Sequence, residues 1–268
     1  MELNNVSLAF ALTILAGLST GIGSLIALQA KRTNAAFLSV ALGFSAGVMI
    51  YVSMVEMFAE AQEIAVSVWG NGGLWAVTGA FFAGMMLITL IDMLVPSYEN
   101  PHEPRRVEEI SESSVSVSNN KLLRIGSMMA IAIAIHNFPE GMATFVSVLH
   151  DPSVGVAIAI AIAIHNIPEG IAVSVPVYYA TGDKQKAFLY SFLSGLSEPL
   201  GALIGFLILL PFMSEAMFAL LFAAVAGIMV FISLDELLPA AREYGKAHHS
   251  VYGMIAGMMV MALSLLLM

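Results

Sequence analysis

Two nearly identical segments occupy the middle of the chain: AIAIAIHNFPEGMA at residues 130–143 and AIAIAIHNIPEGIA at residues 159–172. They match at 12 of 14 positions and lie 29 residues apart. Each sets a His, an Asn and a Glu in an apolar stretch, with the His four and the Asn three residues before the Glu. In a helix, this spacing places the three polar side chains on one face. What that face can do depends on the surrounding chain.

The composition is that of a membrane protein. Only 11% of the 268 residues are charged and 59% are hydrophobic, with a mean hydropathy of +0.89. A soluble domain carries about 25% charged residues. These values exclude a disordered chain, a nucleic-acid binder and an ordinary cytosolic enzyme. The absence of Cys removes disulfides, thiolate metal sites and Cys nucleophiles.

The chain divides into stretches long enough to cross a bilayer, which requires about 20 mainly apolar residues. Eight are predicted: 7–30, 35–59, 73–95, 122–149, 153–178, 187–210, 216–240 and 251–268. We therefore expect an all-α polytopic membrane protein that forms a single transmembrane domain over residues 1–268. Residues 96–121, rich in Pro, Ser and Glu, are predicted to be a flexible cytoplasmic loop.

The basic residues predict the orientation. All ten fall in alternate loops: Lys31, Arg32, Arg105, Arg106, Lys121, Arg124, Lys184, Lys186, Arg242 and Lys246. Because basic residues favour the cytoplasmic side, these four loops should be cytoplasmic and both termini should lie outside. No cleavable signal peptide is evident, since no basic region precedes the first span.

A second, fainter repeat joins the two ends of the chain. AGLSTGIGSLI (16–26) resembles SGLSEPLGALI (194–204), and AGVMIYVSMVE (46–56) resembles AGIMVFISLDE (226–236). AGMM occurs at 83–86 and again at 256–259. Spans one to three run opposite to spans six to eight in the predicted orientation. The pattern predicts an inverted repeat around spans four and five, a plan typical of secondary transporters with a substrate site near the membrane midplane.

Polar residues gather at the predicted midplane of three spans. They are His136, Asn137, Glu140, His165, Asn166, Glu169 and Glu198. A charged side chain at the bilayer centre costs about 2.5–3.5 kcal/mol, and no Lys or Arg lies at this depth. Protons or a metal cation must therefore neutralise the three carboxylates.

The residue types favour a metal cation. Imidazole, carboxylate and amide oxygen suit Zn, Fe, Mn or Co. Pro139, Pro168 and Pro199 should also open helical turns and expose carbonyl oxygens beside the polar layer. Further candidate residues mark a route for the ion, with Met49 as a thioether ligand at mid-depth, Glu56 towards the outside, and Asp92, Asp235 and Glu236 towards the inside.

The paired motifs HNFPEG (136–141) and HNIPEG (165–170) resemble those of the ZIP (Zrt/Irt-like) metal transporters, and the likeness covers essentially the whole chain. The resemblance implies an uptake transporter of the bacterial inner membrane that carries divalent metal into the cytoplasm by an elevator-like movement. It implies a broad substrate range, zinc first, with iron(II), manganese(II) and cobalt(II) behind. The loop after span three contains only His102, whereas many eukaryotic relatives have a His-rich loop there.

The resemblance also implies a two-metal centre. One metal would use Glu140, His165 and Glu169, with His136 adjacent. The other would use Asn137, Glu140, Asn166, Glu169 and Glu198, so that the two motif Glu residues bridge. Zn²⁺ and Fe²⁺ are then substrates, and no cofactor is expected. The expected partners are divalent ions and the lipid bilayer, with a second copy of the chain as a candidate.

Two other functions compete with metal transport. A proton- or sodium-coupled transporter of another solute would also need buried carboxylates, but it would normally add apolar or aromatic substrate contacts. An intramembrane metalloprotease would place His and Glu at midplane, yet the H-E-x-x-H motif is absent because Asn follows each His. We therefore do not expect an enzyme.

Overall fold

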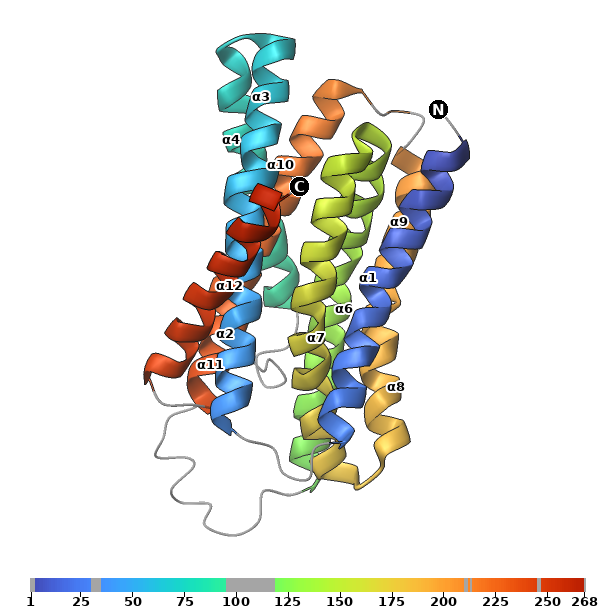
Figure 1. Cartoon of the computed structure of the whole chain (residues 1–268), viewed down its shortest axis with the longest axis vertical. Coiled ribbons are helices and arrows are strands. Elements are labelled where there is room, and N and C mark those ends of the chain that lie inside the picture. The colour runs from blue at the N-terminus through green and yellow to red at the C-terminus, as the bar shows by residue number, and fades with distance from the viewer. Residues whose placement is uncertain are drawn as a thin grey trace.

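Every element in the described part of the chain is helical (Figure 1). The computed structural model describes residues 3–29, 35–94, 119–209, 212, 214–244 and 247–267. The elements are α1 (Leu3–Gln29), α2 (Ala35–Tyr51), η1 (Val52–Met57), α3 (Phe58–Trp69), α4 (Gly72–Leu94), α6 (Asn119–His150), α7 (Pro152–Thr181), α8 (Lys184–Gly195), α9 (Ser197–Ile204), η2 (Gly205–Leu209), α10 (Glu215–Ile232), η4 (Ser233–Leu237), α11 (Leu238–Tyr244) and α12 (Ala247–Leu267). The elements labelled η are π-helical turns that continue the neighbouring α-helices.

Seven segments in the described residues are long and apolar enough to cross a membrane. They are Asn4–Gln29, Ala36–Trp69, Gly72–Ile91, Pro152–Val175, Lys184–Ile208, Glu215–Arg242 and His248–Leu267. The 32-residue helix α6 adds an eighth long helix. The predicted fold class, an all-α polytopic membrane protein, is thereby confirmed.

Several helices run past the limits predicted from apolarity. The second span continues through α3 to Trp69 instead of ending at 59, and α6 begins at Asn119, inside the loop predicted for 96–121. Residues 96–118 of that loop lie outside the described residues, and so does His102. The extensions have a simple cause. A helix satisfies its own backbone hydrogen bonds on either side of the membrane surface, so it need not end where the apolar stretch ends.

The two ends of the bundle are distinct. Figure 1 shows the N-terminus of α1, the C-terminal end of α12 and the turn between α3 and α4 towards one end. The turn between α7 and α8 lies at the other end. Gly182 has a φ of +68°, in the left-handed region that favours glycine, and it ends α7. Asp183 then caps α8 by accepting from the backbone N–H groups of Gln185 and Lys186.

Close helix contacts repeat between the two ends of the chain, as an inverted repeat requires. A Cβ built on Gly84 of α4 would lie 2.0 Å from the Ala224 carbonyl oxygen of α10. The equivalent Gly257 of α12 faces the Phe44 carbonyl oxygen of α2, with a corresponding distance of 2.1 Å. Both contacts need glycine, because only a residue without a side chain lets two backbones approach so closely.

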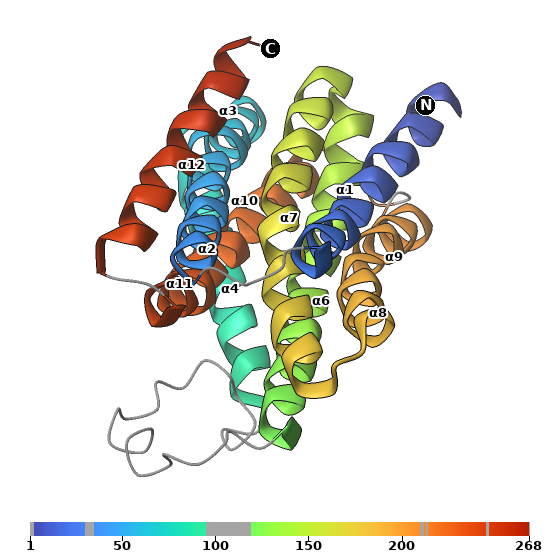
Figure 2. The ribbon, with the colours of Figure 1, turned by 60° about the horizontal axis from the view of Figure 1, so that its bottom comes forward.

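The helices form two groups, which Figure 2 shows side by side. The first consists of α1, α6, α7, α8 and α9, and the second of α2, α3, α4, α10, α11 and α12. In the first group, the pair α1 and α7 is related by the repeat to the pair α9 and α6. In the second group, the pair α2 and α12 is related in the same way to the pair α10 and α4. The groups meet mainly where α2 contacts α7 and where α10 contacts α6. The predicted polar residues lie in the first group.

Two of the three prolines near the polar layer lie within continuous helices. Helix α6 runs through Pro139 and α7 through Pro168 without a break. Only near Pro199 is a helix interrupted, because α8 ends at Gly195 and α9 begins at Ser197. Neighbouring helices packed on both sides can hold a helix together across a missing backbone hydrogen bond.

Candidate metal centre

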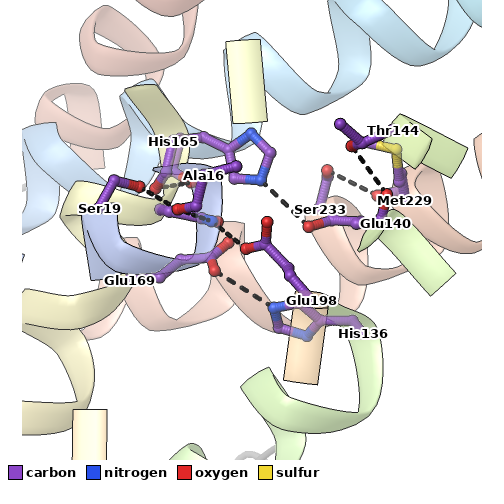
Figure 3. Close-up of polar contacts among 12 residues, drawn as sticks. Ala16, Ser19, His136, Glu140, Thr144, His165, Glu169, Glu198, Met229 and Ser233 are labelled. Carbon is purple, nitrogen blue, oxygen red and sulfur yellow. Dashed lines mark hydrogen bonds and ion pairs between the residues drawn. The ribbon is translucent and has the colours of Figure 1, made fainter. Parts of the chain in front are cut away.

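The seven predicted midplane residues lie on neighbouring helices of the first group, and Figure 3 shows His136, Glu140, His165, Glu169 and Glu198 close together. They come from α6, α7 and α9, and each is at most 1% exposed: His136, Asn137, Glu140, His165, Asn166, Glu169 and Glu198. We call these seven residues the centre. Their burial in a helical bundle that spans the membrane means that their charges are poorly solvated unless another group compensates them.

The His and Glu side chains pair between the two motifs, not within each motif. The Nε2 atom of His136 lies 3.4 Å from Oε2 of Glu169, and Nε2 of His165 lies 3.4 Å from Oε2 of Glu140. Because α6 and α7 pack against each other in opposite directions, the His of each helix meets the Glu of the other. The result is two His–Glu pairs that are related by the repeat, His136 with Glu169 and His165 with Glu140.

The spacing within each pair suits a shared cation. Two ligands bound to one tetrahedral zinc at about 2.0–2.1 Å lie about 3.3 Å apart. Among the described residues, however, no three His, Asp or Glu side chains already form a metal shell. A cation bound by three or more of these side chains at once therefore requires some of them to rotate.

Many polar atoms of the centre have no hydrogen-bond partner. They are Nδ2 and Oδ1 of Asn137, Oε1 of Glu140, Nδ1 of His165, Oδ1 of Asn166, Oε1 of Glu169 and Oε2 of Glu198. An unsatisfied buried polar group costs about 1–3 kcal/mol, and a charged one costs more. Such an excess of free oxygen and imidazole donors fits a site for a passing cation.

Asn166 joins three helices at the centre. Its Nδ2 donates to Oε1 of Glu198 in α9 and, at 3.0 Å, to the carbonyl oxygen of Ala16 in α1. The hydroxyl of Ser45 in α2 donates to the carbonyl oxygen of His165 at 3.2 Å, which ties the second helix group to α7 beside the centre. Asn166 and Glu198 are therefore positioned by packing from outside their own helices.

The predicted route residues lie at different distances from the centre. Oε2 of Glu236, on η4, is 3.8 Å from Nδ1 of His136, so Glu236 adjoins the centre itself. Met49 is fully buried in α2, and Glu56 lies half-buried on η1. Asp235 belongs to η4, next to Glu236. Asp92 belongs to α4, but its side chain lies outside the described part of the structure.

Two π-helical turns carry these acids at equivalent places in the repeat. η1 contains Glu56, and η4 contains Asp235 and Glu236. Such turns are rare and occur frequently at functional sites. The sequence gives no signal for them, because the apolar pattern of the flanking helices continues unchanged.

Two further polar residues were missed. One carboxylate oxygen of Glu60, in α3, is buried without a hydrogen-bond partner, four residues beyond Glu56. Glu60 lies just beyond the predicted span 35–59, so it is not among the candidate residues named from the sequence. Thr20 of α1 is fully buried and its hydroxyl has no partner. Its alignment with Glu198 in the repeat was the signal that could have found it.

The fold and the centre define a class of protein: a polytopic membrane protein built from an inverted repeat, a plan typical of secondary transporters, with buried carboxylates and imidazoles between the repeats. Sequence comparison identifies the family. A family profile described as "ZIP Zinc transporter" matches residues 96–265. The chain therefore belongs to the ZIP zinc transporter family, a family of transporters and not of enzymes, as the paired motifs predicted.

Relatives from several bacteria match almost the whole chain. A protein named zinc transporter ZupT from Oceanobacillus iheyensis is 61% identical over 267 residues, which is 99% of this chain and 100% of that protein. Proteins of the same name from Streptococcus mutans and Clostridium perfringens are 63% and 60% identical over 260 and 278 residues. These alignments cover 97% of this chain and 97% of the S. mutans protein, and 99% of this chain and 98% of the C. perfringens protein.

Proposed function

We propose that this chain carries divalent metal cations, zinc first, across a membrane into the cytoplasm. The observation that carries the proposal is the centre, where three buried carboxylates and two imidazoles leave several polar atoms without a partner. A dication would supply the missing charge and the missing contacts at once. The name shared by the relatives, zinc transporter, supports zinc as the first substrate.

Two metal positions account best for the donor set. Glu140, His165 and Glu169 would hold one ion, with His136 adjacent. Glu140 and Glu169 would bridge to a second ion, whose other donors are Asn137, Asn166 and Glu198. Because these donors are nitrogen and oxygen atoms and no thiolate is present, iron(II), manganese(II) and cobalt(II) should also be accepted.

Movement of the first helix group against the second would expose the centre to each side in turn. The groups meet along few helix pairs, and each half of the repeat carries a Glu on a π-helical turn. Metal would enter past Glu56 and Met49 and leave past Glu236, Asp235 and Asp92. The Glu236 carboxylate, beside His136, is placed to take over a ligand position during release.

The setting we propose is the inner membrane of a bacterium, with both termini outside and a homodimer as a candidate assembly. The segregation of all ten basic residues supports the orientation. The bacterial origin of the relatives supports the membrane.

Zinc uptake into proteoliposomes tests the function directly. Glu140→Ala and Glu169→Ala should each abolish uptake, because each removes a bridging carboxylate and leaves a buried imidazole without its partner. Glu63→Ala is the matched control, since Glu63 is exposed on α3, and it should transport normally. Near-normal uptake in both centre variants would refute the assignment.

Two further measurements separate the competing functions. If the substrate were another solute moved with protons or sodium, that solute and not zinc would raise the thermal unfolding temperature of the purified protein. If the protein were a protease, it would cleave a membrane peptide in detergent. Zinc-dependent stabilisation without cleavage is the result expected here.

A further inference from the structure

The inverted repeat pairs Thr20 with Glu198. A Cβ built on Gly141, next to Glu140 in the first motif, would lie 2.0 Å from the carbonyl oxygen of Glu198. A Cβ built on Gly170, next to Glu169 in the second motif, would lie 1.8 Å from the carbonyl oxygen of Thr20. Thr20 therefore has the same position relative to α7 that Glu198 has relative to α6.

The two residues that the repeat pairs, Glu198 and Thr20, differ in their hydrogen bonds. Glu198 accepts a hydrogen bond from Asn166, the Asn of the second motif. Asn137, the Asn of the first motif, is fully buried, and neither its Nδ2 nor its Oδ1 has a partner. Thr20 is also fully buried, and its Oγ1 has no partner. Three unsatisfied polar atoms therefore lie on the side of the repeat where Glu198 has no counterpart.

The Thr20 hydroxyl lacks the bond that other threonines in this chain make. Four of them donate to the carbonyl oxygen four residues earlier, at 2.7–2.9 Å: Thr13, Thr89, Thr144 and Thr181. For Thr20 that acceptor is Ala16, whose carbonyl oxygen already accepts from Ser19 Oγ at 2.6 Å and from Asn166 Nδ2 at 3.0 Å (Figure 3). Because two other side chains already donate to this carbonyl, the Thr20 hydroxyl is left without its local acceptor.

We propose that the Thr20 hydroxyl and the Nδ2 of Asn137, whose Oδ1 stays available to the second metal ion, together hold a water molecule that serves as a further ligand of that ion. The Thr side chain is two bonds shorter than that of Glu, a difference of about 2.5 Å when extended. That gap is close to the separation of about 2.8 Å between hydrogen-bonded oxygens. A water can bridge two protein groups nearly as well as a direct hydrogen bond, provided that the site is polar and large enough.

The consequence is a centre with chemically unequal halves. One half ends in the Glu198 carboxylate, and the other ends in a neutral aqua ligand oriented by Thr20 and Asn137. A neutral ligand binds a dication more weakly than a carboxylate, and water also exchanges more readily than a protein group. Thr20 is thus a positioning residue, and the inference rests on the proposed function because it presumes that metal occupies the centre.

Replacement of Thr20 by Val tests the inference with little change in shape. In the purified full-length protein we expect Thr20→Val to weaken the second of two zinc-binding events by about tenfold or more, as loss of a residue that orients a ligand does. With Co²⁺, the visible absorption should intensify as an aqua ligand is lost. Thr20→Ser should restore both properties. Thr13→Val is the matched control, since Thr13 is fully buried on the same helix but is bonded to Ala9.

The results distinguish this inference from the proposed function. If Thr20→Val and Thr13→Val bind two zinc ions with the same affinities and give the same cobalt spectrum, Thr20 holds no ligand and the inference fails. If Glu140→Ala binds zinc normally, the proposed function fails first. Should Thr20→Val not fold, the wild-type protein still decides the matter. Its bound Mn²⁺ must show broadening of the electron paramagnetic resonance lines in ¹⁷O-labelled water, and unbroadened lines would overturn the inference.

Discussion

Gly141→Ala should disturb the centre without removing any of its ligands. The added Cβ would lie 2.0 Å from the Glu198 carbonyl oxygen, whereas real Cβ atoms essentially never approach a heavy atom within 3.0 Å. Helices α6 and α9 must therefore separate locally by at least 1.0 Å, the difference between these two distances. The obstacle is backbone and cannot rotate away. Overpacking of this kind costs about 1–3 kcal/mol.

The displacement should be seen in both stability and metal binding. Glu198 moves with the backbone of α9, so its contact with Asn166 lengthens and zinc affinity falls. For a chain of this size we expect the thermal midpoint to drop by about 2–12 °C. Differential scanning fluorimetry in detergent and zinc titration measure the two effects.

Gly79→Ala provides the control for this prediction. Gly79 lies in α4 with nothing within 4 Å of its built Cβ. Alanine there should be neutral or stabilising, because it reduces the conformational freedom of the unfolded chain. If Gly141→Ala were as stable as Gly79→Ala and bound zinc equally well, the close approach of α6 and α9 would be wrong.

Three other outcomes are expected. Zinc affinity should fall as the pH is lowered from 7.5 to 5.5, because carboxylate and imidazole ligands must lose their protons to bind metal. Zinc titration at several pH values, with proton release recorded, measures this effect, and an affinity that does not change with pH would exclude His ligands. Glu56→Ala should slow zinc uptake but leave equilibrium zinc binding largely intact, since Glu56 is not among the residues of the centre. Measuring flux and zinc affinity for the same variant tests this, and an equal loss of uptake and affinity would make Glu56 a ligand. Asp183→Ala should lower the free energy of unfolding by about 1 kcal/mol, because the carboxylate caps α8 through the N–H groups of Gln185 and Lys186. Asp183→Asn should preserve most of the stability. Equal melting temperatures for Asp183→Ala and the wild-type protein would show that the cap contributes little.

The sequence predicts the fold class and the members of the centre for a clear physical reason. Apolar runs and buried charges are constrained by the membrane independently of the tertiary structure. The spacing within each motif predicts that His136 shares a face with Glu140. It does not predict that His136 pairs with Glu169, because that contact depends on how α6 and α7 cross.

Other features required the tertiary structure. The π-helical turn η4 brings Glu236 to His136, although apolarity alone places Glu236 near the end of its span. The unsatisfied hydroxyl of Thr20 depends on two hydrogen bonds that reach Ala16 from elsewhere. Neither Pro139 nor Pro168 interrupts its helix, because neighbouring helices can hold a helix together across a missing backbone hydrogen bond.

The crossed pairing of the two motifs bears on the origin of such a chain. Neither α6 nor α7 completes a His–Glu pair alone, because each supplies the imidazole of one pair and the carboxylate of the other. A shorter ancestor with a single motif would have gained a working centre only by associating with a copy inserted upside down in the same membrane. Gene fusion would then have fixed the two opposed orientations in one polypeptide and freed positions such as 20 and 198 to diverge.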